Sequence, residues 1–251
     1  MDAFYASVEL LRYPELRAQP VVIGGTSRHQ PRDTIDPATG LPMRIFAVLR
    51  DYVGRGVITT ATYEARAFGV RAGIGLMKAA KLAPQAVLLP VDMEEYRRYS
   101  RRFKAAVRAV APQVEDRGVD EIYIDLTEAI ASHPDPWAHA RTVALELKQA
   151  VHQATGLSCS IGITPNKLLS KIASDLDKPD GVTVLSHDDV PRRIWPLPAS
   201  RINGIGPKAF EKLEGLGIHT IGELAAASPQ WLLEQFGRSY GAWLHNAAHG
   251  R

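Results

Sequence analysis

The sequence has a single cysteine and no hydrophobic stretch long enough to cross a membrane. Cys159 is the only thiol among 251 residues, so an internal disulfide is excluded and a reducing compartment is favoured. No run of about 18 apolar residues occurs, so we expect no transmembrane helix. The N-terminus carries Asp2 and Glu9 in place of a basic and then apolar segment, so we expect no signal peptide. These absences favour a cytoplasmic protein.

Several motifs of other enzyme classes are also missing. The sequence contains no Walker phosphate-binding loop, no nucleophile elbow and no paired CxxC motif. Cys159 lies in a strand-like segment, where a buried structural thiol is expected rather than a nucleophile. His245 and His249 are four residues apart on an expected helix, but no third metal ligand accompanies them, so we expect solvated or capping roles.

Charge of one sign is not in excess either, because 30 Lys and Arg residues stand against 27 Asp and Glu residues, a net charge of +3. That total does not by itself indicate a nucleic-acid partner. Six basic residues are nevertheless concentrated between Arg97 and Arg108. A solvated helix face and a surface that contacts phosphates explain this cluster equally well.

Hydrophobic periodicity predicts a mixed α+β chain of a length that allows more than one domain. Apolar residues recur at helical spacing over residues 94–110, and again from Trp137 to near Gly156. Residues 119–126 and 157–163 are rich in apolar and β-branched residues and predict strands. The order favours a ferredoxin-like antiparallel sheet covered on one face by two helices, with its first strand supplied by the extreme N-terminus.

The segments on either side of this region differ in character. VVIGG, at residues 21–25, predicts a short buried strand, and the Pro-, Asp-, Thr- and Arg-rich segment after it predicts a loop. Residues 56–63 are strand-like. After residues 191–198 the chain becomes helical and is interrupted by glycines, with no internal repeat.

Asp120 and Glu121 form the most informative pair of residues. Two adjacent carboxylates repel each other at the start of a strand-like run. A divalent cation such as Mg²⁺ removes that repulsion, because it requires hard oxygen ligands. A hydrated hairpin tip is the simpler explanation, and the dipeptide alone does not exclude it.

Five segments, taken together and in this order, resemble the Y-family DNA polymerases, and most closely the polymerase IV branch that copies past damaged bases. They are MDAFYASVE, TTATYEARAFGV, GVDEIYIDLT, SIGITPNKLLSKIASDLDKPDG and INGIGPKAFEKL. The resemblance implies a template-directed, error-prone, lesion-bypass DNA polymerase that acts in bacterial DNA repair and works as a monomer. Its partners would be primer–template DNA and deoxynucleoside triphosphates.

The resemblance also implies a division into domains. Residues 1–4 and 92–185 would form a discontinuous palm with the ferredoxin-like sheet. Residues 5–91 would form small α/β fingers with an inserted loop near residues 26–51, and residues 186–251 would form an all-helical thumb. The family's little finger and its clamp-binding tail would lie beyond Arg251.

By the same resemblance, Asp120 and Glu121 are catalytic and, with Asp2, bind two Mg²⁺ ions, for which Mn²⁺ could substitute. The family's first motif has two aspartates separated by one residue. Asp2 matches the second aspartate, and the first would fall before Met1. We expect a truncated or mis-started sequence rather than an altered site. If that aspartate is truly absent, the chain would be a non-catalytic DNA-binding relative.

The family's pattern assigns incoming-nucleotide contacts to Phe4, Tyr5, Tyr63, Arg66 and Lys178. Tyr5 would be the steric gate whose ring occupies the space of a ribose 2′-hydroxyl, although an ordinary core aromatic is the alternative. The i, i+3 spacing lets the tyrosine and arginine of TYEAR share one helical face. Both would contact the triphosphate, as would the lysine of DKPDG.

A helix-hairpin-helix motif is the second strong likeness. Gly204 and Gly206 precede a helix opened by a proline, so that the backbone and Lys208 could approach a DNA phosphate. Lys171 could contact DNA or be solvated. Asp180 stands where the family usually has Asn, a difference that we expect to be tolerated. A palm-fold nucleotide cyclase would share the carboxylates, but it would not need this motif.

Overall fold

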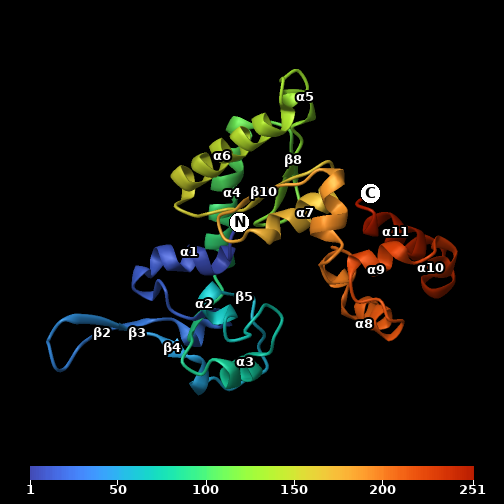
Figure 1. Ribbon diagram of the computed structural model, residues 1–251. Helices are drawn as coiled ribbons and strands as arrows, with labels where there is room; N and C mark the ends of the chain where they lie inside the picture. Colours follow the sequence, from blue (N-terminus) through green and yellow to red (C-terminus); the bar gives the residue numbers. More distant parts are fainter. The chain divides into compact units, whose positions relative to one another are not determined.

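The computed structural model covers residues 1–251 and divides into two compact units. The first unit comprises Met1–Ile122 and Ala150–Leu157, and the second comprises Tyr123–Gln149 and Ser158–Arg251 (Figure 1). None of the helices combines the length and the apolar character that crossing a membrane would require.

A four-stranded sheet forms the centre of the first unit, with the strand order β4-β6-β1-β5. The strands are β1 (Val21–Gly25), β4 (Ala47–Val48), β5 (Thr60–Ala61) and β6 (Val87–Pro90). β1 runs parallel to β6 and antiparallel to β5, and β4 runs antiparallel to β6. The buried strand predicted at residues 21–25 is therefore confirmed as a central strand.

The sheet is buried on both faces, and alternate residues of β1 enter different hydrophobic clusters. Val21 and Ile23 pack with Phe4 and Tyr96, whereas Val22 packs with residues of the opposite face. All three β1 side chains are 0% exposed. Burial on both faces explains why the strand is a continuous apolar run rather than an alternating one.

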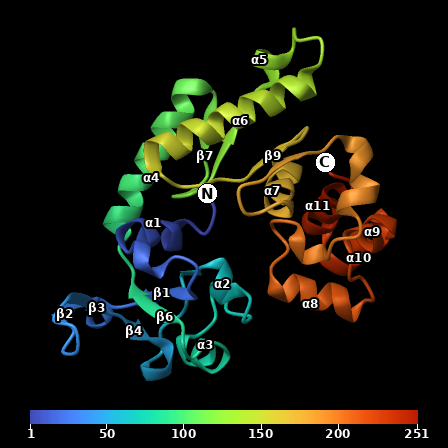
Figure 2. The ribbon, with the colours of Figure 1, turned by 60° about the vertical axis from the view of Figure 1, so that its left-hand side comes forward.

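Helices cover this sheet, and Figure 2 shows their order along the chain. They are α1 (Phe4–Arg12), α2 (Tyr63–Arg66), α3 (Leu76–Leu82) and α4 (Met93–Val110). The last agrees with the amphipathic helix predicted at residues 94–110. Its apolar stripe is buried at Tyr96, Phe103 and Val107, as helical spacing requires.

The extreme N-terminus does not form the strand that we expected for the palm. Residues 1–3 have no strand assignment, and α1 begins at Phe4. Ala3 adopts a left-handed conformation with φ 41°, which turns the chain into the helix. Phe4 and Val8 are then one turn apart on the buried side, so helical packing outweighs the strand preference of the aromatic pair.

The segment predicted as a loop after β1 contains a β-hairpin. β2 (Arg32–Ile35) pairs antiparallel with β3 (Pro42–Ile45), and the hairpin projects from its unit in Figure 1. Asp33 lies opposite Arg44, and their ion pair measures 2.8 Å. The Asp36 carboxylate accepts hydrogen bonds across the turn at 2.7 and 2.9 Å. These polar contacts order a segment that has no buried residue.

The chain leaves α4 through a second hairpin. β7 (Val114–Asp116) and β8 (Ile122–Ile124) form a two-stranded sheet. β8 confirms a strand inside residues 119–126, although it is shorter than predicted. It is followed by α5 (Thr127–Ile130) and α6 (Pro136–Thr155), which confirms the helix predicted from Trp137 to near Gly156.

In the second unit, β9 (Ile161–Ile163), α7 (Lys167–Leu176) and β10 (Val182–Val184) form a strand–helix–strand unit. β9 and β10 run parallel, so the expected antiparallel arrangement is wrong for this pair. The crossover helix explains the direction, because it returns the chain to the end where the first strand began. β9 also begins later than the predicted 157–163 strand.

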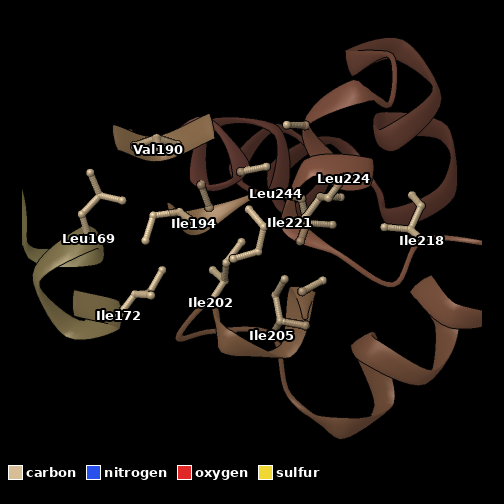
Figure 3. Packing of buried hydrophobic residues seen from close by; sticks show 14 of the residues in the cluster. Leu169, Ile172, Val190, Ile194, Ile202, Ile205, Ile218, Ile221, Leu224 and Leu244 are labelled. Carbon is tan, nitrogen blue, oxygen red and sulfur yellow. The ribbon is translucent and has the colours of Figure 1, made fainter. Parts of the chain in front are cut away.

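The C-terminal part is helical, as predicted. It contains α8 (Pro207–Gly215), α9 (Ile221–Ala226), α10 (Pro229–Phe236) and α11 (Arg238–Ala248). Side chains of these helices share one hydrophobic cluster with Leu169 and Ile172 of α7 (Figure 3). The helical segment is thus held to α7 by a continuous core within the second unit.

Candidate active site

Asp120 and Glu121 lie in a tight turn immediately before β8. The backbone N–H groups of Arg117 and Gly118 both donate to the Glu121 carbonyl at 3.1 Å. Lys104 of α4 donates to the Gly118 carbonyl at 2.7 Å and so fixes the same turn from outside. Both acidic residues are partly buried, which disfavours the fully hydrated hairpin tip.

The N-terminal motif lies beside this turn. The backbone nitrogen of Met1 donates to the Asp120 carbonyl at 2.9 Å, across 119 positions of sequence. The structure therefore brings together two of the motifs from which a single site was predicted. Both belong to the first unit.

Asp120 and Glu121 are the two adjacent carboxylates that the sequence assigns to a divalent cation. Adjacent oxygen donors at Asp120 and Glu121 are of the hard type that such an ion takes. Asp2 is 2% exposed, and no group of three or more acidic, histidine or cysteine side chains is arranged to hold a metal. Metal binding by Asp120, Glu121 and Asp2 therefore stays a prediction.

Tyr5 lies on α1 with its ring stacked on Tyr96, the ring centroids being 4.2 Å apart and the planes inclined by 12°. Burial raises the pKa of the Tyr5 hydroxyl, and the negative charge of Asp120 raises it further against the opposite effect of Arg97. The hydroxyl is therefore within electrostatic reach of the carboxylate turn. Tyr5 is only partly buried, unlike an ordinary core aromatic.

Phe4, by contrast, is a core residue. Its side chain is 3% exposed, with its ring centroid 5.7 Å from that of Tyr5 and 6.2 Å from that of Phe103. A contact between the Phe4 ring and an incoming nucleotide is therefore not supported. Its backbone N–H belongs to the first turn of α1, where N–H groups have no acceptor within the helix, so a backbone contact to phosphate stays a prediction.

Several basic residues of the α4 cluster (residues 97–108) form ion pairs within the first unit. Lys104 and Arg108 both pair with Asp116 of β7, at 2.7 and 3.1 Å. Arg98 pairs with Glu95 one turn away, and its guanidinium also lies 5.1 Å from the Tyr99 ring. These contacts favour the solvated-face interpretation for part of the cluster.

Tyr63 and Arg66 share one side of α2, as their spacing predicted. The Arg66 guanidinium lies 4.8 Å from the Tyr63 ring centroid, and its Nε donates to the Ala61 carbonyl at 3.0 Å. Thr62 caps the helix by accepting from the Ala65 N–H at 3.4 Å. The guanidinium is thus oriented by the ring and by one backbone contact, and it has several further N–H donors.

Lys178 lies in the second unit, between α7 and β10. Its ammonium forms an ion pair with Asp175 at 2.7 Å, and its side chain is 25% exposed. Lys171 is partly buried on α7. The structure places both lysines on or next to one short helix, and their contacts to a nucleotide or to DNA stay predictions.

Lys148 of α6 is a functional candidate that sequence reasoning missed. Its ammonium donates to the carbonyls of Cys159 and Asp180, each at 2.7 Å, and pairs with the Asp180 carboxylate. Its side chain is only 14% exposed. This contact explains how Asp is accommodated at position 180, and it holds the segment that carries Lys178. A lysine on an amphipathic helix gives no sequence signal of such a role.

The two glycines of the helix-hairpin-helix motif differ in what the fold requires. Gly204 has φ +116°, and a Cβ there would lie 2.6 Å from the Trp243 ring. Tyr240 also donates to the Gly204 carbonyl at 3.0 Å. Packing within the unit is therefore sufficient to explain Gly204.

Gly206 is not required by packing. Its φ is −77°, which any residue can adopt, and an added Cβ would meet no atom within 4 Å. It is the N-cap of α8 and is followed by Pro207 and an exposed Lys208. An exposed helix start with a bare backbone and a nearby cation is the arrangement predicted for a phosphate contact.

The histidine pair is structural. The ring Nδ1 of His249 lies 2.8 Å from the His245 carbonyl at the end of α11. This contact agrees with the capping role that we expected.

Comparison with known proteins agrees with these features. The impB/mucB/samB family matches residues 1–175. DNA polymerase IV of Methanoculleus marisnigri is 38% identical over 250 residues, which cover 100% of this chain and 62% of that protein. DNA polymerase IV 1 of Bacillus subtilis is 37% identical over 250 residues, covering 100% of this chain and 53% of that protein. The chain thus spans only 53–62% of the length of these relatives.

Solved structures give the same result. The crystal structure of DinB from Sulfolobus solfataricus superposes with a TM-score of 0.78 at 26% identity, over 99% of this chain and 65% of that one. An insertion ternary complex of Dbh DNA polymerase gives a TM-score of 0.77 at 26% identity, with the same coverage. The chain therefore belongs to the impB/mucB/samB family, as its resemblance to the Y-family DNA polymerases predicted.

Proposed function

We propose that this chain is the catalytic core of a template-directed DNA polymerase of the error-prone, lesion-bypass type. The contact between the Met1 backbone nitrogen and the Asp120 carbonyl carries the proposal, because it joins the gate motif to the carboxylate turn. Relatives named DNA polymerase IV and the solved ternary complex of a related polymerase support it. Its substrates are then primer–template DNA and deoxynucleoside triphosphates.

DNA polymerases use divalent metal ions, and we assign Mg²⁺ to this site, with two ions in the working complex. Such ions lower the barrier by stabilising charge on the reacting phosphate oxygens. Asp120 and Glu121 would supply oxygen ligands to such ions from the turn before β8. Lys104, held between Asp116 and the Gly118 carbonyl, keeps that turn in place.

Other side chains orient the nucleotide. Tyr5 restricts the space beside the sugar 2′ position, with Tyr96 behind its ring. Arg66 and Tyr63 hold phosphate oxygens through a guanidinium fork and a phenolic hydroxyl. When a nucleotide binds, the Lys178 ammonium leaves the Asp175 carboxylate and contacts the phosphates of the leaving group. Its positive charge then offsets the negative charge that develops on those phosphates.

We assign the palm to residues 1–4 and 92–185, the fingers to residues 5–91 and the thumb to residues 186–251. The thumb contacts the DNA backbone through Gly204, Gly206 and Lys208, and Lys171 adds a further contact. We assign to the longer protein a sliding-clamp contact outside this chain. A monomer suffices for this activity.

Primer extension tests the proposal. We expect Asp120→Asn and Glu121→Gln each to lower turnover by at least about a hundredfold, because each removes a charge that stabilises the transition state. DNA affinity should change far less. The assay uses the printed chain and a version extended upstream to include an aspartate two positions before Asp2.

The matched control is Glu115→Gln, which neutralises an exposed carboxylate of the same hairpin. It should extend primers like the parent. Near-normal primer extension by Asp120→Asn or Glu121→Gln would contradict the assignment of these two residues as catalytic. A parent that binds primer–template DNA but extends no primer in either version would instead indicate a DNA-binding relative.

A further inference from the structure

Glu9 is a carboxylate buried in the core of the first unit. It lies on α1 and is 2% exposed, among residues of an apolar cluster. Burying a carboxylate is costly unless hydrogen bonds and opposite charge compensate for its lost hydration. A buried acid one helical turn after Tyr5 therefore calls for a physical reason.

Two contacts compensate for the burial of Glu9. The Tyr96 hydroxyl donates to its carboxylate at 2.8 Å, and the Arg12 guanidinium lies 3.5 Å away. Arg12 also pairs with Asp92 at 2.8 Å. Asp92 in turn caps α4 by accepting from the Glu95 N–H at 3.1 Å.

These contacts determine how α1 and α4 face each other. Tyr5 and Glu9 are four residues apart, so they lie on the same side of α1. Tyr96 of α4 meets both, the first through its ring face and the second through its hydroxyl. Tyr96 itself is 0% exposed, so its ring cannot move without disturbing the core.

We infer that Glu9 is a positioning residue for sugar selection, a role that rests on the proposed polymerase function. Its carboxylate holds the Tyr96 hydroxyl, and the Tyr96 ring then fixes the place and tilt of the Tyr5 ring. Stacked rings resist sliding because packing and quadrupole terms favour one offset. Discrimination against a 2′-hydroxyl by shape depends on that placement, since a small retreat of the gate would admit the extra oxygen.

Glu9→Gln and Glu9→Leu separate this role from a merely structural one. Gln retains an oxygen that accepts from Tyr96, whereas Leu has a similar size and accepts nothing. The readout is the kcat/KM for a deoxynucleotide divided by that for the matching ribonucleotide. We expect Glu9→Leu to lower this ratio at least about tenfold and Glu9→Gln to keep it within about threefold of the parent.

Two further variants bracket the result. Tyr5→Ala removes the gate and sets the largest loss of discrimination. Glu15→Gln removes another carboxylate–arginine contact near α1, a pair with Arg44 at 2.9 Å, and should leave the ratio unchanged. A folded Glu9→Leu protein with the parent ratio would overturn the inference. A Glu9→Gln protein whose kcat/KM ratio falls as much as that of Glu9→Leu would also overturn the inference.

A second readout does not depend on activity. Ring-labelled tyrosine NMR reports the stacking of Tyr5 on Tyr96 through ring-current shifts. Glu9→Leu should move the Tyr5 signals towards unstacked values, and Glu9→Gln should not. If the parent extends no primer but the signals move as stated, the proposed function fails and the positioning contact stands. If the parent extends primers and neither readout changes, the inference fails alone.

Discussion

Among the single residues, His245 is a partly buried histidine whose ring lies 4.5 Å from that of His249. Its Nδ1 is shielded from solvent and has no hydrogen-bond partner. Burial lowers the pKa of His245, and the nearby His249 and Arg251 lower it further. The folded protein therefore favours the neutral ring, whereas the unfolded chain protonates near the ordinary pKa of about 6.5.

This difference predicts a pH dependence of stability. As the pH falls through about 6.5, the unfolded chain gains a proton that folded His245 resists, so stability is lost. Between pH 8 and pH 5.5 the melting temperature of the parent should fall more than that of His245→Gln. His219→Gln, which alters an exposed histidine, is the control and should not reduce the fall. If the melting temperatures of the parent and of His245→Gln fell by the same amount over this pH range, this account would be contradicted.

The local features of the candidate site can be predicted from the sequence, whereas its long-range contacts cannot. The shared face of Tyr63 and Arg66 follows from helical spacing, and Asp120–Glu121 was identified from two adjacent charges. The contacts of Tyr96 and Lys148 were missed, because they join positions far apart in the chain. Nothing in a one-dimensional pattern distinguishes a buried ionic contact of this kind from a solvated side chain.

At the scale of elements, helices with clear amphipathic stripes were predicted well, as residues 94–110 illustrate. The errors occurred where a few local contacts decide the structure. Ala3 turns the chain into α1, and a crossover helix makes β9 and β10 parallel. The β2–β3 hairpin was missed because it buries nothing, so its strands lack the hydrophobic alternation that identifies a strand.

Because the β2–β3 hairpin is exposed, we expect it to contribute little to the stability of the protein. No residue from Pro31 to Ile45 is buried, and the ion pair of Arg44 with Glu15 is an exposed contact. Replacing residues 31–45 by a short Gly-Ser linker should change the free energy of unfolding by less than about 1 kcal/mol, because exposed ion pairs contribute little. Urea unfolding followed by circular dichroism measures this change.

The core supplies the matched control for that experiment. Val22 of β1 is 0% exposed, so Val22→Ala should cost about 2 kcal/mol through lost burial and a residual cavity. If removal of the hairpin destabilised the protein as much as Val22→Ala, the hairpin would be part of the folding unit rather than an appended element.

For the chain taken as one protein, the proposed function predicts that the helical C-terminal segment holds DNA. Gly206→Val tests this cleanly, because an added Cβ meets no atom within 4 Å and the φ of −77° suits valine. Valine is a poorer N-cap than glycine, so a small loss of stability, about 1 kcal/mol, is expected. The branched side chain would, however, stand where a phosphate should approach the backbone.

DNA affinity should therefore fall several-fold for every sequence, with no change in base preference, because backbone contacts carry no sequence information. Affinity should remain salt-dependent, since lysines and arginines elsewhere still neutralise phosphates. Fluorescence anisotropy at several salt concentrations measures both effects.

Gly215→Val is the control, because an added Cβ there also meets no atom within 4 Å but lies at the opposite end of α8. If folded Gly206→Val bound DNA as tightly as Gly215→Val, the hairpin would not be a phosphate contact. A cyclase-like use of the carboxylate turn, which needs no DNA, would then become the better explanation.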